Sequence, residues 1–164
     1  MTESAPTIPV TTPPATAHRK IADIFRYWQR IAPAPDRLPG RQHFDPVDVP
    51  KLLENVWLLD VVGTPPAFRF RLIGSATVRA GIPNRIGSDV LAFVPEAARA
   101  RAYADFAFVV EARSPLWFRG PAMLPHHKEI FELERLYLPL AGDGARVDML
   151  LNLTVFYTST GAES

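Results

Sequence analysis

The residues that could bind a metal or act as nucleophiles are few, and they are scattered along the sequence. The chain has four histidines and no cysteine. His18 borders an N-terminal tail, His43 lies in a turn-rich segment, and His126 and His127 lie in a polar connection. Without cysteine there is no disulfide, no thiolate nucleophile and no metal site built on sulfur. The histidines have no recognisable ligand spacing, so we predict no metal site.

Carboxylates gather in one stretch, at Glu129, Glu132 and Glu134. Glu132 and Glu134 would share a face at strand spacing, and two such carboxylates could act as general acid and base. The interpretation that we favour is an exposed strand face with ion pairs to basic residues such as Arg119. No catalytic triad, phosphate-binding loop or dinucleotide motif can be found. We therefore expect no enzyme activity. An enzyme of cone-shaped NTF2-like fold is a third hypothesis, after the two that are given below.

The composition is that of one ordinary globular domain. The chain has 164 residues, of which 48% are hydrophobic and 21% charged, and a formal net charge of +1. Such a charge does not favour nucleic acid as a partner. No apolar run is long enough for membrane insertion, and the N-terminus lacks the features of a secretory signal. We expect a cytoplasmic protein.

The ends of the chain are predicted to be flexible and the part between them to be one domain. Residues 1–17 are rich in proline and threonine and cannot bury enough apolar surface to offset their ordering entropy. Residues 160–164 are predicted to be flexible as well. The domain over 18–159 begins with a helix over 18–32, because apolar residues recur there at offsets of three and four. Its apolar face consists of Ile21, Ile24, Phe25, Trp28 and Ile31.

The rest of the domain is predicted to be a mixture of strands and helices. A helix over 95–112 begins at a proline, which favours the first turn of helices, and shorter helical pieces are expected over 75–93. The apolar alternation and the turn residues predict five strands, over 56–62, 68–73, 116–123, 129–139 and 147–157.

The last strand has two distinct faces. One face is wholly apolar and should meet the longer helices and any ligand; it contains Val147, Met149, Leu151, Leu153 and Val155. The other face is mixed, and its Leu150 and Phe156 need a cover. We expect that cover to be the helix over 18–32, either from the same chain or from a second subunit.

Several stretches resemble a known family. They are Tyr27-Trp28, FDPVDVPKLLENVWLLDV (44–61), FRFRLIGSATV (68–78), ARSPLWFRG (112–120) and LYLPLAGDGARVDMLLN (136–152). Together with the order of elements, they resemble a PAS domain of a subfamily common in alphaproteobacteria. The resemblance implies an α+β fold with a five-stranded antiparallel sheet in the order 2-1-5-4-3. Helices would cover one face of the sheet, and the N-terminal helix would flank or cover the other.

The resemblance also implies a role in bacterial signal transduction. It suggests a stand-alone sensory and regulatory module that acts through protein–protein interaction, as a homodimer packed through the N-terminal helix and with a signalling protein as partner. PAS domains also hold haem, flavin or a small metabolite between sheet and helices. No histidine lies on the helix over 95–112, where haem-binding relatives usually place their ligand, and photoreactive flavin chemistry needs a cysteine. No cofactor is predicted.

A small-molecule sensor is the alternative function, with an apolar or planar ligand between the sheet and the helices. Its candidate ligand-binding residues are aromatic: Phe70, Phe93, Tyr103, Phe106, Trp117 and Phe131. The same side chains could simply fill the core, which is the interpretation that we favour. The candidate interface residues are those of the helix face, Ile21, Ile24, Phe25, Trp28 and Ile31.

Overall fold

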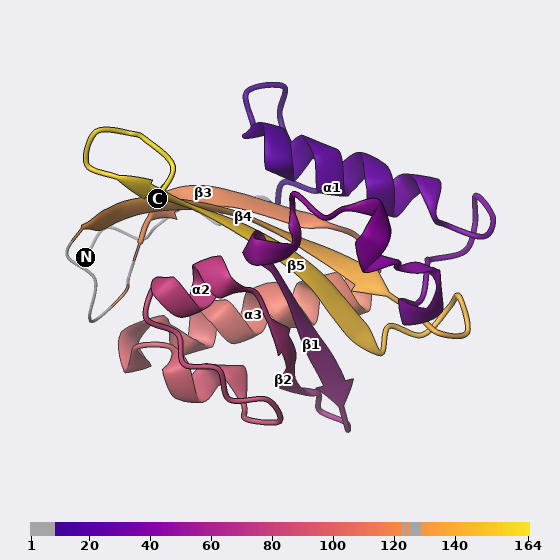
Figure 1. The fold of residues 1–164 in the computed structure, drawn as a ribbon. Helices are drawn as coiled ribbons and strands as arrows, with labels where there is room; N and C mark the ends of the chain where they lie inside the picture. Colours follow the sequence, from indigo (N-terminus) through magenta and orange to yellow (C-terminus); the bar gives the residue numbers. More distant parts are fainter. Residues whose placement is uncertain (1–8, 123, 125–128) are drawn as a thin grey trace.

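A computed structural model describes residues 9–122, 124 and 129–164. Within these ranges a single antiparallel sheet lies between two helical layers (Figure 1). Its strands are β1 (Val56–Val62), β2 (Ala67–Ile73), β3 (Leu116–Pro121), β4 (Ile130–Leu140) and β5 (Met149–Thr158). Their order is β2-β1-β5-β4-β3, which confirms the predicted fold class.

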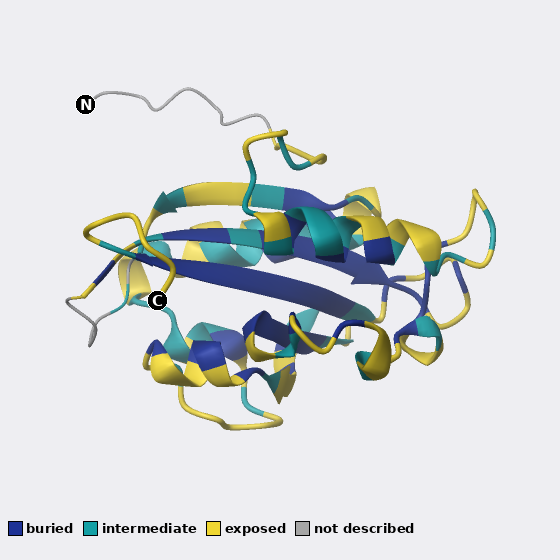
Figure 2. Ribbon diagram, turned by 45° about the horizontal axis from the view of Figure 1, so that its top comes forward, coloured by how far each residue is buried: buried dark blue, intermediate teal, exposed yellow. Residues whose placement is uncertain are grey.

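β5 lies at the centre of the sheet. β5 pairs with β1 on one side and with β4 on the other, so that Asn152 has Trp57 and Tyr137 as its cross-strand neighbours. Both faces of β5 are covered, and the strand is buried along nearly its whole length (Figure 2). The edge strand β2 carries Arg69 and Arg71 on its exposed side, where the charges oppose edge-to-edge pairing.

Three α-helices flank the sheet in the described part of the chain: α1 (Arg19–Arg30), α2 (Ser75–Arg79) and α3 (Glu96–Ala112). His18 caps α1, because its Nδ1 accepts a hydrogen bond of 3.0 Å from the backbone N–H of Lys20. Short 3₁₀ helices at Arg41–His43, Pro46–Asp48, Leu53–Asn55 and Val90–Phe93 connect the elements. α1 lies on one face of the sheet, and α2 and α3 lie on the other (Figure 1).

The two faces of β5 are assigned in the opposite way to the sequence prediction. Leu151, Leu153 and Val155 belong to the core packed by α1, whereas Leu150 packs with residues of α3 and Phe156 packs beside the end of α2. Strand alternation determines which residues share a face, but it does not determine which helix covers that face. We call the face toward α1 the outer face and the face toward α2 and α3 the inner face.

Described residues near both ends of the chain contact the sheet. The backbone N–H of Trp117 donates a hydrogen bond of 2.8 Å to the carbonyl oxygen of Val10 at the β3 edge. The N–H of Ser164 donates to the carbonyl oxygen of Phe156 at 2.9 Å. These pairs satisfy edge groups that would otherwise face solvent. Residues 1–8 of the predicted tail lie outside the described residues.

None of the helices in the described ranges has the length and apolar character that crossing a membrane requires.

Candidate functional site

The inner face of the sheet carries an aromatic cluster beneath α3. The rings of Trp57 and Tyr137 meet edge to face at 5.9 Å, and Phe106 of α3 lies 5.0 Å from Tyr137. Phe70 of β2 lies 6.2 Å from Trp57 and 5.9 Å from Phe93. These separations are typical of favourable aromatic packing. The cluster fixes the spacing between the sheet and the helical layer.

Four of the six aromatic residues predicted to bind a ligand lie in or beside this cluster. Phe70 and Phe106 are buried in it, and Phe93 and Tyr103 are partly buried against it. Tyr103 also donates a hydrogen bond of 2.9 Å to the carbonyl oxygen of Pro66. The structure therefore brings these four residues together on the inner face.

The other two predicted ligand-binding residues are elsewhere. Trp117 packs against the outer-face core, because it pairs with Leu136, which points to that side. Phe131 is 56% exposed, since it lies at an irregularity where the pairing of β4 with β5 shifts register. An irregularity of this kind breaks the alternation on which the prediction rested. Neither residue belongs to the inner-face cluster.

Three polar side chains of the inner layer hold buried atoms without a hydrogen-bond partner among the described residues. Both the Nδ2 and the Oδ1 of Asn152 are unpartnered, as are the Oγ1 of Thr77 and the Nε of Arg135. Asn152 is fully buried, and Thr77 is buried on α2. Asn152 shares the inner face with Trp57 and Tyr137, its neighbours across the sheet. We call Asn152, Thr77 and Arg135 the polar set.

Neighbouring polar groups of this face form hydrogen bonds, unlike the unpartnered atoms of the polar set. Thr154 accepts a hydrogen bond of 3.0 Å from the Nε1 of Trp57 through its Oγ1. The hydroxyl of Tyr137 accepts a hydrogen bond of 3.1 Å from the Nη1 of Arg135. Burial raises the pKa of Tyr137 above its ordinary value, and the nearby guanidinium of Arg135 opposes that shift. Tyr137 is therefore a neutral phenol at physiological pH.

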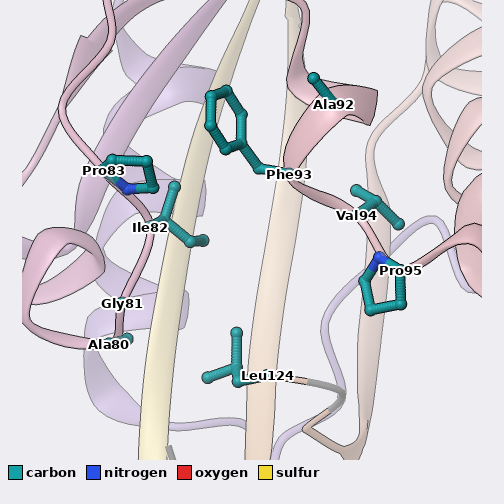
Figure 3. Close-up of a pocket in the computed structure, with 9 residues that line it drawn as sticks. All are labelled: Ala80, Gly81, Ile82, Pro83, Ala92, Phe93, Val94, Pro95 and Leu124. Atoms are coloured by element: carbon teal, nitrogen blue, oxygen red, sulfur yellow. The ribbon is translucent and has the colours of Figure 1, made fainter. Parts of the chain in front are cut away.

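A hollow of about 470 Å³ lies beside the inner face, between the segment that follows α2 and the start of α3. Apolar side chains line it, notably Ile82, Phe93, Val94 and Leu124 (Figure 3). Ala80, at the end of α2, both lines the hollow and packs with Phe156 of β5. A hollow of this size lies within the range that accommodates small organic ligands.

On the outer face, Glu134 is a fully buried carboxylate rather than part of an exposed strand face. Its oxygens accept hydrogen bonds from the Nε1 of Trp117 at 2.9 Å, the hydroxyl of Tyr157 at 2.8 Å and the backbone N–H of His18 at 3.1 Å. Burial, followed by the hydrogen bond to Glu134, raises the pKa of Tyr157. Arg119 contacts Glu132 at 2.7 Å on the surface and lies 3.9 Å from Glu134, so both predicted ion pairs are present. Glu134 therefore has a structural role, because its carboxylate oxygens accept hydrogen bonds from groups of the protein itself.

The helix face predicted to form an interface is largely used within the chain. Ile21 and Ile24 are 0% exposed in the core between α1 and the sheet. Phe25, Trp28 and Ile31 are partly buried against that core, and Trp28 donates a hydrogen bond of 2.9 Å to the carbonyl oxygen of Pro139. α1 therefore covers the sheet of its own chain, one of the two arrangements predicted.

Within the described ranges, no cluster of three or more histidine, aspartate or glutamate side chains is arranged to hold a metal ion. His126 and His127 lie outside the described residues, so the expectation for them rests on sequence alone.

A comparison with protein-family models matched the model described as PAS domain over residues 16–154. The chain belongs to the PAS-domain family. The match spans α1, the strands up to the middle of β5 and the helices of the inner layer, which together make up most of this PAS domain. Searches of curated proteins and of solved structures returned no match. As a PAS domain, the chain is a sensory or regulatory module in signalling.

The polar set of the PAS domain was not among the predicted site residues. A signal for Asn152 was present, because it and Thr154 are polar residues within the most apolar strand of the chain. Thr77 and Arg135 carry no such signal, since threonine and arginine are ordinary residues on a short helix and on a mixed strand. Their burial depends on contacts between segments far apart in the sequence.

Proposed function

We propose that this PAS domain is a cytoplasmic bacterial sensor that binds a small molecule on the inner face of its sheet and changes its protein contacts in response. The observation that supports this proposal most is Asn152 on the central strand, which is 0% exposed and whose amide has no hydrogen-bond partner among the described residues. The proposal assigns the domain no catalytic step.

The energetic argument starts from the cost of burying an amide. A buried polar group without a hydrogen bond costs about 1–3 kcal/mol of stability, and a leucine of similar size would avoid that cost. Asn152 nevertheless lies between Trp57 and Tyr137, and the polar atoms of both these residues form hydrogen bonds within the protein. A ligand with polar groups would supply the missing partners for both ends of the amide.

Native mass spectrometry of freshly purified protein tests this function. We expect part of the protein to carry an extra mass that disappears on denaturation and is recovered as a small molecule. Asn152→Leu should abolish that mass. A folded wild-type protein that carries no extra mass, and whose unfolding temperature does not change with any member of a metabolite library, would overturn the proposal.

The response would reach other proteins through the part of α1 that remains accessible. Phe25 stacks on Trp28 with ring centroids 6.1 Å apart, and together with Ile31 these side chains are partly exposed. Homodimers or a signalling partner would contact this surface rather than Ile21 and Ile24. Neighbouring apolar side chains that remain partly exposed on one helix are a common feature of interaction surfaces.

Light scattering tests the homodimer. Phe25→Glu should lower the measured mass from that of a dimer to that of a monomer. Arg26→Glu, one residue along on the exposed side, is the matched control and should leave the mass unchanged. A wild-type protein that is monomeric at all concentrations would contradict the homodimer without affecting ligand binding.

A further inference from the structure

We propose that the ligand of the inner face is a small organic carboxylate, with its charged end at Arg135 and Asn152 and its apolar end in the hollow beside α2. This inference rests on the proposed function, because it names the chemical class of ligand for that same site.

Among the residues that the structure describes, Arg135 is a cation without a carboxylate partner. Its Nη1 donates to the neutral hydroxyl of Tyr137, and its Nε is buried without a partner among the described residues. Other arginines of the domain are paired differently: Arg119 contacts Glu132 at 2.7 Å, and Arg101 contacts Asp105 at 2.9 Å. A partly buried guanidinium with a free donor is suited to an anion, because charge-assisted hydrogen bonds are the stronger kind.

The register places the amide of Asn152 close to this cation. Arg135 pairs with Thr154, and the next inner-face pair along the same two strands is Tyr137 with Asn152. Arg135 and Asn152 are therefore diagonal neighbours on one face, a separation of about 7–8 Å between their backbones. The Nδ2 of Asn152 and the Oγ1 of Thr77 can both donate, which suits the two oxygens of a carboxylate.

The apolar lining of the hollow indicates that one end of the ligand is apolar. Thr77 lies one turn before Ala80 on α2, and its carbonyl oxygen accepts a hydrogen bond of 3.3 Å from the N–H of Ile82. Ala80 and Ile82 line the hollow together with Phe93 and Leu124 (Figure 3). Thr77 of the polar set therefore lies next to the lining of the apolar hollow at α2. A short hydrocarbon chain with one carboxylate matches both parts.

Calorimetric titration with a matched series tests the ligand class. The probes are butanoate, hexanoate, octanoate and decanoate, each compared with its primary amide, which has nearly the same shape but no charge. The protein is first unfolded in urea and refolded to release any carried molecule, and recovery of a cooperative unfolding transition confirms the refolding. We expect at least one carboxylate to bind about tenfold or more tightly than its amide.

Two variants test whether the polar set binds the carboxylate. Arg135→Gln should weaken carboxylate binding about tenfold and abolish the preference for the acid over the amide. Arg71→Gln removes an exposed arginine from the edge strand β2 and should leave the affinity unchanged. Circular dichroism of both variants checks that they are folded.

The outcomes separate this inference from the proposed function. If amides bind as well as acids, or if Arg71→Gln weakens binding as much as Arg135→Gln, the carboxylate assignment is overturned while a small-molecule sensor stands. If a molecule recovered from purified protein is neutral and none of the acids binds, the assignment is also overturned. If neither a carried molecule nor any probe or library compound binds, the proposed function fails with it.

Discussion

The indole Nε1 of Trp117 donates a hydrogen bond of 2.9 Å to the Oε1 of Glu134 beneath the start of α1. The same carboxylate accepts hydrogen bonds from Tyr157 and from the backbone N–H of His18, the residue that caps α1. One buried side chain of β4 therefore joins β3, β5 and the N-terminal helix. Lys20, further along α1, forms an ion pair with Glu163 near the C-terminus, so both chain ends are held at this corner of the sheet.

Glu134→Gln should destabilise the domain and loosen the start of α1. The three groups hydrogen-bonded to Glu134 all donate, and Arg119 lies 3.9 Å away as a cation, whereas a glutamine offers one acceptor oxygen and a nitrogen that donates. The loss of one charge-assisted hydrogen bond costs about 1.5–3 kcal/mol. Urea denaturation measures the change in the free energy of unfolding, and amide hydrogen exchange reports on α1.

Glu132→Gln is the matched control for that variant. Its carboxylate pairs with Arg119 on the surface, where an ion pair contributes about 0–1 kcal/mol. Equal losses of stability in the two variants would contradict the role assigned to Glu134.

Stability should fall as the pH rises above about 10, partly because of Tyr157. Burial and the hydrogen bond to Glu134 raise the pKa of Tyr157 in the folded protein, whereas in the unfolded chain it has its ordinary value of 10.0. Above that value the unfolded state loses the proton that the folded state retains, so the free energy of unfolding decreases with pH. Urea denaturation at about pH 8 and about pH 11 measures this decrease.

Tyr157→Phe removes the titrating phenol and should flatten that decrease, although the variant is less stable at neutral pH because a hydrogen bond to Glu134 is lost. A slope that is the same in wild type and variant between the two pH values would show that other groups control the alkaline behaviour.

Asn152→Leu should stabilise the ligand-free domain by about 1–3 kcal/mol, because it removes a buried amide that has no hydrogen-bond partner in the described part of the chain. Thr154→Val is the matched comparison two residues along the same face. It removes the acceptor of the Trp57 indole and should destabilise the domain by about 1–2 kcal/mol. Urea denaturation of refolded protein measures both changes. A loss of stability in Asn152→Leu would indicate that the amide has partners within the folded protein.

Gly74→Ala should be strongly destabilising. A Cβ at Gly74 would lie 2.5 Å from the carbonyl oxygen of Val56 and 2.7 Å from that of Leu53, and it would also collide with the carbonyl oxygen of Glu54. These are backbone atoms that cannot move aside, so we expect a loss of about 2 kcal/mol or more. Ser75→Ala, at the next and exposed position, should change the free energy of unfolding by less than about 0.5 kcal/mol. Thermal unfolding that is the same for both variants would contradict this close packing.

Much of the fold follows from local pattern. The alternation in β5 and the apolar runs of β1 predict central strands, and Gly142 to Gly144 predict the turn between β4 and β5. The helix bounds agree to within two residues, because prolines and capping residues mark where helices begin and end. The six aromatic residues predicted to bind a ligand do not all lie together. Trp117 and Phe131 are aromatic, but aromatic character does not indicate the side of the sheet to which a residue points.

The sequence by itself determined the elements, their order and the PAS family of this protein, because these depend on periodicity and on motifs within short segments. Only the tertiary structure decided that α1 covers the face of Leu151 and Leu153, and that Asn152 lies toward α2 and α3. The tertiary structure alone also buried Glu134 among hydrogen-bond donors and, within the described residues, left the Nε of Arg135 without a partner. The physical reason is that burial and hydrogen bonding depend on which distant segments meet, and no pattern within one strand contains that information.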